Sequence, residues 1–320
     1  MLTRPRTTNN DFATAFDTVQ RLQNIYTRVG QLRYLLPHGR FWSSLKIIDR
    51  FVNQHIIRVL MLPTSDSSDP HSTSTKHTFL HELAKATRDP KALRDQVVAV
   101  LLAGRDTTAA TLSWSIYELS KHPNCVAQLR AEVLSIIGEL KAPTYTDLKK
   151  MTYLRAVLNE TLRLYPPIPF NVRLALKDTT LPRGGGPDGT KAVAVLKDTP
   201  ICYSPLLLHR RADLYPSASS TFADPASFSP ERWDVWQPHS SNHIPFNAGL
   251  RTCVGQQFAI TEMTYVLARF FQRFASLENR MDCKDQEETP LQSGIVLTSR
   301  RDILVSLTLG SSTAMAKAEA

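Results

Sequence analysis

The segment from Phe246 to Gly255 carries the residues best suited to chemistry. It reads FNAGLRTCVG and leads directly into a helical pattern. A helix N-terminus and the cationic Arg251 both stabilise a thiolate, the form of cysteine that binds metals, so Cys253 is a candidate metal ligand. Gly249 and Gly255 carry no side chains, which lets something flat and bulky approach the backbone beside the sulfur. An isolated cysteine at a helix start is more often a buried, inert thiol, but these neighbours favour ligation.

A second group of residues is suited to holding that segment in place. Glu160 and Arg163 are three positions apart in a helical pattern, so they share one face and can pair. Alone, such a pair is usually a surface ion pair worth about 0.3–0.5 kcal/mol. The sequence PERW at 230–233 adds Arg232, which offers a second guanidinium to the same carboxylate. Charge-assisted contacts of this kind would fix the loop that presents Cys253.

A third group lies in the middle of a long apolar helical pattern, where residues 103–108 read AGRDTT. Threonine can hydrogen-bond back to the preceding turn, and Gly104 weakens the helix, so a distortion is expected here. An acid beside an alcohol, Asp106 beside Thr107, can hold a water molecule or relay a proton. The alternative is a kinked helix whose polar groups are satisfied internally.

Helices must position most of these residues. The pattern over 89–122 is opened by Asp89 and Pro90 and closed by Pro123, as at the ends of helices. Shorter apolar periodicities predict further helices, and β-branched runs separated by glycines predict a hairpin-rich insert at 170–205 and a strand at 303–309. The fold class is therefore mainly α with a minor β region. The further helices are expected at 11–34, 41–62, 124–138, 147–165 and 255–275.

The composition of the 320 residues supports one globular domain over 1–320. Hydrophobic residues make up 42% and charged residues 21%, outside the range of disordered chains. The longest aliphatic run, 97–103, is too short to cross a bilayer. The four cysteines show no spacing typical of zinc sites or a disulfide framework, and the opening residues resemble no secretory signal, so a reducing compartment is expected. Residues 64–77 predict an exposed Ser/Thr-rich loop and 311–320 a flexible tail.

The charge of the chain favours acidic partners. Lysine and arginine number 38 against 29 acidic residues, a net charge of +9, and residues 1–63 carry nine cations against three acids. A basic balance suits nucleic acid, an anionic membrane or an acidic protein. Nucleic acid is disfavoured, because the arginines are spread along helical patterns instead of forming a compact run with interleaved aromatics.

These motifs resemble those of the cytochrome P450 monooxygenases. Residues 246–255 match the haem-binding signature F-x-x-G-x-R-x-C-x-G at every fixed position, and the A-G-x-D-T-T, ExxR and PERW motifs occur in the order the family has them. The similarity covers the chain from residue 11 onward. The runs AGRDTTAATLSW, LPRGGGPDG and FNAGLRTCVGQQFA look most like the fungal subgroup that hydroxylates n-alkanes and fatty acids. The resemblance implies a cytochrome P450 fold, and the portion that the family has N-terminal to this stretch is expected to be missing.

The resemblance also implies roles for individual residues. Cys253 would be the proximal ligand of haem b iron, and Glu160, Arg163 and Arg232 would form a structural triad. Phe246 would pack near the sulfur, and the family's pattern makes the remaining matched positions haem contacts or proton donors. The implied haem contacts are Arg173, Phe246, Gly249, Arg251 and Gly255, and the implied catalytic pair that delivers protons during oxygen activation is Asp106 and Thr107.

The implied reaction inserts one atom of O2 into a C–H bond of an alkyl-chain substrate that is bound in a hydrophobic pocket. The electrons would come from NADPH through a flavoprotein reductase. Association with the cytoplasmic face of the endoplasmic reticulum membrane is implied for full-length relatives. Two alternatives stay open: a non-catalytic remnant unable to retain haem, and a member that uses peroxide without a reductase, which Asp106 and Thr107 disfavour. One departure is Leu250, where this subgroup usually has proline.

Overall fold

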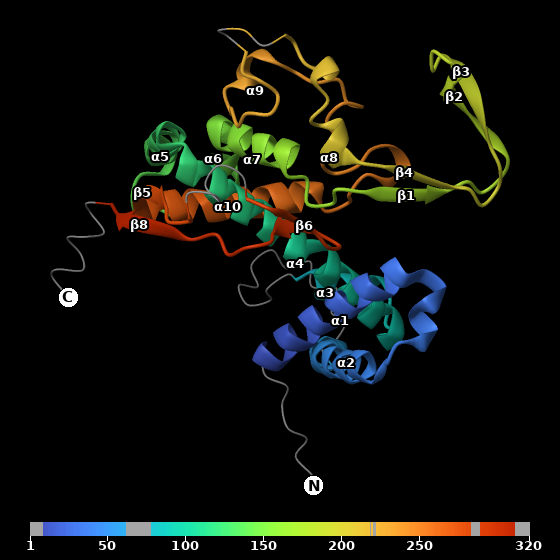
Figure 1. Ribbon diagram of the computed structural model, residues 1–320. Coiled ribbons are helices and arrows are strands. Elements are labelled where there is room, and N and C mark those ends of the chain that lie inside the picture. The colour runs from blue at the N-terminus through green and yellow to red at the C-terminus, as the bar shows by residue number, and fades with distance from the viewer. Residues whose placement is uncertain (1–8, 62–77, 218, 220–221, 283–288, 311–320) are drawn as a thin grey trace. The chain divides into compact units, whose positions relative to one another are not determined.

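The computed structural model describes residues 9–61, 78–217, 219, 222–282 and 289–310 (Figure 1). The chain separates into two compact units, Met1–Arg105 and Asp106–Ala320, and the division falls within the long helix α4 (Pro90–Lys121). The predicted loop at 64–77 and the predicted tail at 311–320 lie outside the described residues. The prediction of mainly α structure with a minor β region is confirmed.

The first unit is helical throughout its described part. It holds α1 (Asn9–Val29), the 3-10 segment η1 (Gly30–Leu35), α2 (Gly39–Leu60), α3 (Phe79–Ala86) and the first half of α4. The helix predicted at 11–34 stops earlier, because Gly30 has a φ of +57°, which an α-helix cannot continue through. The short α3 was not predicted. Side chains such as Phe16, Ile56 and Leu93 form the core of this unit.

Helix α4 confirms the long helix predicted at 89–122. The carboxylate of Asp89 accepts hydrogen bonds from the amides of Lys91 (3.0 Å) and Ala92 (3.3 Å), which caps its first turn. The backbone remains α-helical through residues 103–108, where the sequence predicted a distortion. The hydroxyl of Thr111 donates to the carbonyl of Thr107 at 2.9 Å, and this bond back to the preceding turn is accommodated without a break.

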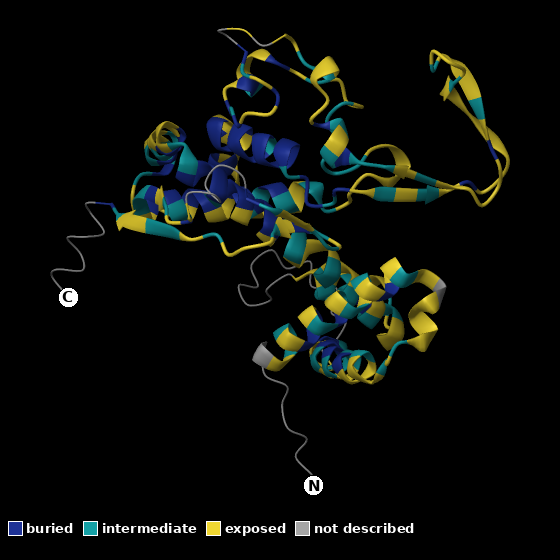
Figure 2. Cartoon of the chain, in the orientation of Figure 1, coloured by how far each residue is buried: buried dark blue, intermediate teal, exposed yellow. Residues whose placement is uncertain are grey.

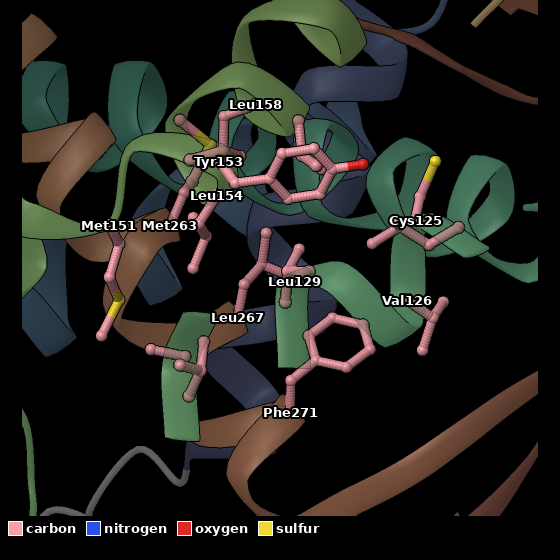
Figure 3. Close-up of a cluster of buried hydrophobic side chains, with 14 of the residues drawn as sticks. Cys125, Val126, Leu129, Met151, Tyr153, Leu154, Leu158, Met263, Leu267 and Phe271 are labelled. Carbon is pink, nitrogen blue, oxygen red and sulfur yellow. The ribbon is translucent and has the colours of Figure 1, made fainter. Parts of the chain in front are cut away.

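The second unit is built on the helices that follow α4. They are α5 (Pro123–Ile137), α6 (Tyr145–Lys150), α7 (Thr152–Leu164) and α10 (Gln256–Arg273). Leucine, methionine and phenylalanine side chains of α5, α7 and α10 fill the core between them (Figure 3). Helix α7 is dark blue over most of its length in Figure 2, since nearly all of its residues are buried. The polar side chains that are buried on this helix must therefore have hydrogen-bond partners.

Two short helices and two 3-10 segments complete the helical part of this unit, and the strands are all short. The short helices are α8 (Pro205–Leu208) and α9 (Arg232–Val235), with η2 (Ala212–Leu214) and η3 (Gly249–Arg251). Within the described residues the strands pair antiparallel in twos, β1 with β4, β2 with β3, β5 with β8 and β6 with β7. Their bounds are β1 Asn171–Leu174, β2 Thr179–Gly185, β3 Lys191–Val195, β4 Pro200–Tyr203, β5 Phe274–Asn279, β6 Leu291–Ser293, β7 Leu297–Ser299 and β8 Val305–Leu309.

The hairpin-rich insert predicted at 170–205 is confirmed as β1 to β4, and the strand predicted at 303–309 is β8. Strands β5, β6 and β7 were not predicted. The single helix predicted at 147–165 is two helices, α6 and α7, which meet at Met151. Thr144 and Asp147 form a capping box that starts α6 two residues earlier than predicted.

The C-terminal end of α10 is tied to α5. The guanidinium of Arg130 on α5 donates to the carbonyls of Gln272 (3.1 Å) and Phe274 (3.3 Å) and also to that of Phe271. The side-chain amide of Gln272 donates to the carbonyls of Gly138 (2.7 Å) and Lys141 (3.0 Å), just past the end of α5. The bonds to Phe271 and Gln272 satisfy carbonyls of the last turn of α10 that have no partner within the helix, and together these contacts fix that turn.

Candidate functional site

Cys253 lies in the tight turn that precedes α10, and its side chain is exposed. The amide of Cys253 donates to the carbonyl of Phe246 at 2.9 Å, which closes the turn. Gly249, with a φ of +69°, adopts a conformation that other residues rarely take, and a Cβ built on it meets nothing within 4 Å. A Cβ on Gly255 would lie 3.9 Å from the Cys253 sulfur. Neither end of the turn therefore carries a side chain, and Gly249 faces open space.

Exposed apolar side chains flank Cys253 in the sequence. Leu250 and Val254 are fully exposed, and Phe258 on the first turn of α10 is 73% exposed. Phe246 is half-buried and packs against the core formed by α5, α7 and α10. Apolar side chains exposed together mark a surface that a partner or ligand covers. A soft thiolate ligand on an apolar, unobstructed face fits a flat macrocycle that carries iron, so these residues are suited to hold haem.

The two arginines expected to contact the haem lie on separate elements. Arg251 is in η3 and is exposed. Arg173 is in β1, where its guanidinium donates to the carbonyl of Val172 at 2.9 Å and lies 5.6 Å from the centroid of the Tyr203 ring. Tyr203 therefore orients Arg173 through a cation–π contact.

Asn247 links the sheet β1–β4 to the cysteine turn, and the sequence analysis did not identify it. The hydroxyl of Tyr203 donates to Asn247 Oδ1 at 2.7 Å, and the Asn247 amide donates to the Asn171 side chain at 3.4 Å. Asn247 has a φ of +66°, a conformation that asparagine tolerates better than most residues. The structure thus brings Arg173 and the cysteine turn together through Tyr203 and Asn247.

Glu160 and Arg163 form the ion pair that the sequence predicted, and both side chains are fully buried. Arg163 Nε and Nη2 each donate to a different carboxylate oxygen of Glu160 at 2.8 Å, in the bidentate geometry. Arg232 Nε donates to Glu160 Oε1 at 3.2 Å, which confirms the predicted second arginine. Burial opposes the charge of Arg163, but the hydrogen bonds and charge of Glu160 outweigh it, so its pKa lies above the usual value.

The carboxylate of Glu160 also accepts two bonds that the sequence did not reveal. Trp233 Nε1 donates to Oε2 at 3.1 Å, and the amide of Ser229 donates to Oε1 at 3.0 Å. The remaining donors of Arg163 and Arg232 bind backbone carbonyls, including those of Pro225 (2.7 Å) and Asp224 (2.9 Å). The bonds to the carbonyls of Pro225 and Asp224 and the bond from the amide of Ser229 fix the loop between η2 and α9.

Two histidines connect that cluster to the cysteine turn. His209, which is fully buried, accepts a hydrogen bond on Nε2 from the amide of Ile244 at 2.9 Å, two residues before Phe246. Its carbonyl accepts from Arg163 Nη1 at 3.3 Å. His243 packs on the rings of His209 and Trp233, at 5.0 and 4.8 Å between centroids.

Both histidines are held neutral. Burial lowers the pKa of His209 to about 4. Burial, together with the nearby His209 and Arg163, lowers the pKa of His243 to about 3. Because Nε2 of His209 accepts a bond, the neutral ring carries its proton on Nδ1, and this buried atom has no hydrogen-bond partner within the described residues. The triad therefore reaches the cysteine turn through uncharged, packed rings.

Asp106 and Thr107 occupy consecutive positions on α4, and both are half-buried. The next residue, Thr108, is buried, and its hydroxyl has no hydrogen-bond partner in the part of the chain that the structure describes. Their role in proton delivery stays a prediction.

Comparison with known proteins identifies the family. Residues 6–305 match the family model described as Cytochrome P450. The chain is 53% identical over 305 residues to "Cytochrome P450 monooxygenase pvhE" of Talaromyces variabilis, covering 95% of this chain and 56% of that protein. It is 42% identical over 277 residues to "Cytochrome P450 52A10" of Candida maltosa, covering 84% and 51%. It is 38% identical over 298 residues to "Cytochrome P450 52A1" of Candida tropicalis, covering 90% and 52%.

A solved structure supports the fold. The crystal structure of a cytochrome P450 (CYP102L1) superimposes with a TM-score of 0.73 at 24% identity, over 93% of this chain and 64% of that one. The chain spans about half the length of the curated relatives it matches. Among the helices of the described ranges, none has the length and hydropathy of a membrane-spanning segment.

Proposed function

Because the chain belongs to the cytochrome P450 family, we propose that it forms the haem-thiolate part of a monooxygenase, with the Cys253 thiolate as the proximal ligand of haem b. One observation carries this proposal. The only side chain of the turn 249–255 able to bind a metal strongly is a thiol, and that thiol is exposed between two glycines on an apolar surface.

The residues around Cys253 would hold the group from several sides. Phe246, anchored in the core, backs the turn, and Gly249 and Gly255 let the backbone approach the ring closely. Arg251 and Arg173 would pair with the two carboxylates of haem b, for which a guanidinium is well suited. When bound, the haem supplies oxygen activation and accepts electrons one at a time.

The protein would contribute to the reaction in two ways: it holds the cysteine ligand in position, and it delivers protons. The Glu160 cluster and His209 keep the cysteine turn in one conformation, so that the sulfur is presented without reorganisation. Asp106 and Thr107 on α4 would deliver protons during oxygen activation, with the hydroxyl of Thr107 as the donor and Asp106 as the group that restores its proton.

The proposed substrate is an alkyl chain, an n-alkane or a fatty acid, hydroxylated most favourably at its end. This rests on the resemblance of the runs AGRDTTAATLSW and LPRGGGPDG to the fungal subgroup with that activity. The proposed electron donor is NADPH, through a flavoprotein reductase that would meet the basic face around Arg251, Arg269 and Arg273. The proposed location is the cytoplasmic face of the endoplasmic reticulum membrane, and no nucleic-acid partner is proposed.

The test is spectroscopic. Residues 1–320 are expressed with haem supplied, purified by gel filtration, reduced and exposed to CO. We expect stoichiometric haem and the red-shifted Soret band typical of thiolate ligation. Cys253→Ala should lose this band, whereas Cys202→Ala, which removes another exposed thiol, should keep it. Haem that absorbs as a histidine-ligated or water-ligated species, or a chain that retains no haem, would contradict the proposal and favour the non-catalytic alternative.

A further inference from the structure

The side chain of Asn247 joins the cysteine turn to the sheet of β1 and β4, two strands that lie side by side in Figure 1. Its Oδ1 accepts a hydrogen bond of 2.7 Å from the Tyr203 hydroxyl, and its Nδ2 donates to the Asn171 side chain at 3.4 Å. Among the described residues, no other side chain of 246–255 hydrogen-bonds outside that segment; the Thr252 hydroxyl, for example, donates to a carbonyl within the turn. The polar contacts between the turn and the sheet therefore pass through Asn247.

Arg173 lies on the same face of this sheet as the two residues that Asn247 contacts. The antiparallel register pairs Asn171 with Tyr203, and Arg173 is two positions farther along β1. Side chains alternate between the faces of a strand and directly opposite residues share a face, so these three side chains project from one side. The Arg173 guanidinium accordingly lies 5.6 Å from the centroid of the Tyr203 ring. Tyr203 thus contacts Arg173 with its ring and Asn247 with its hydroxyl.

The Asn247 side chain is held from two directions. Its Oδ1 accepts the Tyr203 hydroxyl from the sheet and also the amide of Ala248 at 3.0 Å. Its own amide donates to the carbonyl of Ile244 at 3.0 Å, and its φ of +66° is one that asparagine tolerates. Glycine would keep this backbone conformation but would lose every side-chain bond. The structure therefore gives Asn247 one orientation, directed at the sheet.

We propose that the Tyr203 hydroxyl and the Asn247 side chain form a latch between the sheet and the cysteine turn. The latch holds Arg173 at a fixed distance from Cys253, so that a carboxylate and the iron of one haem are bound together. This inference rests on the proposed function and deepens it. Two contacts to one rigid ligand reinforce each other only when their separation matches the ligand, and the latch sets that separation. Tyr203 and Asn247 are positioning residues, because they act through Arg173 and through the turn.

Hydrogen exchange of the haem-free chain, followed by mass spectrometry, tests the latch without any ligand. The amide of Cys253 is protected by its bond to the carbonyl of Phe246. Tyr203→Phe removes one net hydrogen bond, which corresponds to a factor of about five, so this amide should exchange about fivefold faster. The matched control is Tyr26→Phe, which removes a hydroxyl bond of 3.1 Å to the carbonyl of Pro37 in the first unit and should leave this exchange unchanged. Equal exchange in Tyr203→Phe and the unaltered chain would refute the latch.

Transfer of haem, and of haem dimethyl ester, from the full chain to apomyoglobin tests the link to Arg173. The ester keeps the iron but lacks the free carboxylates with which a guanidinium pairs. Tyr203→Phe should release haem about fivefold faster than the unaltered chain and should release the ester at the unaltered rate. In a chain that already carries Asn247→Gly, Tyr203→Phe should have no further effect, because both changes remove the same bond. Equal acceleration for haem and the ester would show that the two residues only stabilise the fold, and would overturn the proposal.

The outcome is separable from that of the proposed function. If residues 1–320 retain no haem, the proposed function fails, and exchange at the Cys253 amide still decides whether the latch holds the turn. If the unaltered chain shows the thiolate spectrum while Tyr203→Phe releases haem and the ester alike, only the latch fails.

Discussion

Replacing Glu160 by glutamine is expected to be among the most destabilising single changes in this protein. The carboxylate accepts five hydrogen bonds, from two nitrogens of Arg163, from Arg232, from Trp233 and from the amide of Ser229. Glutamine has the same shape, but one oxygen becomes an NH2 group that faces two or three donors. Both guanidiniums, fully buried, then lose their counter-charge.

The size of the effect follows from these contacts. Removing one partner of a buried ion pair costs about 3–5 kcal/mol, and each buried donor left without an acceptor costs about 1–3 kcal/mol, partly within the same sum. We therefore expect Glu160→Gln to lower the free energy of unfolding by about 3–5 kcal/mol. This is a large share of the 5–15 kcal/mol typical of native proteins.

Urea unfolding followed by tryptophan fluorescence measures the loss, because Trp233 touches Glu160 directly. The matched control is Glu82→Gln, which breaks an exposed pair with Lys85 at 2.9 Å and should cost less than about 0.5 kcal/mol. If the free energy of unfolding of Glu160→Gln lies within about 1 kcal/mol of that of the unaltered chain, the backbone carbonyls alone stabilise the buried arginines and the reasoning is wrong.

Two further predictions concern titration and proton transfer. Burial lowers the pKa of His209 from 6.5 to about 4. Below pH 6.5 the unfolded chain therefore binds a proton at this residue that the folded protein binds only near pH 4. The free energy of unfolding is thus highest above pH 6.5 and falls by about 3 kcal/mol as the pH is lowered from 6.5 to 4. Urea midpoints for the unaltered chain and His209→Gln should converge as the pH falls from 7.5 to 4.5; parallel curves would exclude His209 as the source. Thr107→Ala should raise NADPH consumption per product in the reductase-coupled holoenzyme, whereas Thr108→Ala, the adjacent hydroxyl, should not; equal coupling in both variants would contradict the proton role of Thr107.

The predictions of helices and strands were correct where the sequence pattern is long and locally consistent. The helical pattern of α4 extends over some thirty residues, with Asp89 and Pro90 marking its start and Pro123 its end, and the folded structure keeps that helix. The break at Met151 was missed, although Thr144 and Asp147 carry a capping box that marks the start of α6. Reading that signal would have placed the start of α6 correctly, but the break at Met151, where α7 begins without a side-chain cap, carries no such mark.

The candidate site was predictable only where a motif encodes it. Glu160, Arg163 and Arg232 could be paired from their spacing and residue types. The contribution of Ser229 could not, because its amide meets Glu160 across 69 positions and no local pattern marks a backbone donor. His209 was missed for the same reason: its burial and its bond to Ile244 arise from tertiary packing alone.

Helix α10 has two ends that are treated differently. Its first turn follows an open, glycine-flanked thiol, whereas its last turn is clamped by Arg130 and by the amide of Gln272. Because its last turn is held in this way, α10 cannot shift along its axis. Variation in how far the sulfur projects must therefore arise from the backbone torsions of residues 249–255, which makes that short arc, more than the helix behind it, the place where substitutions would tune the ligand.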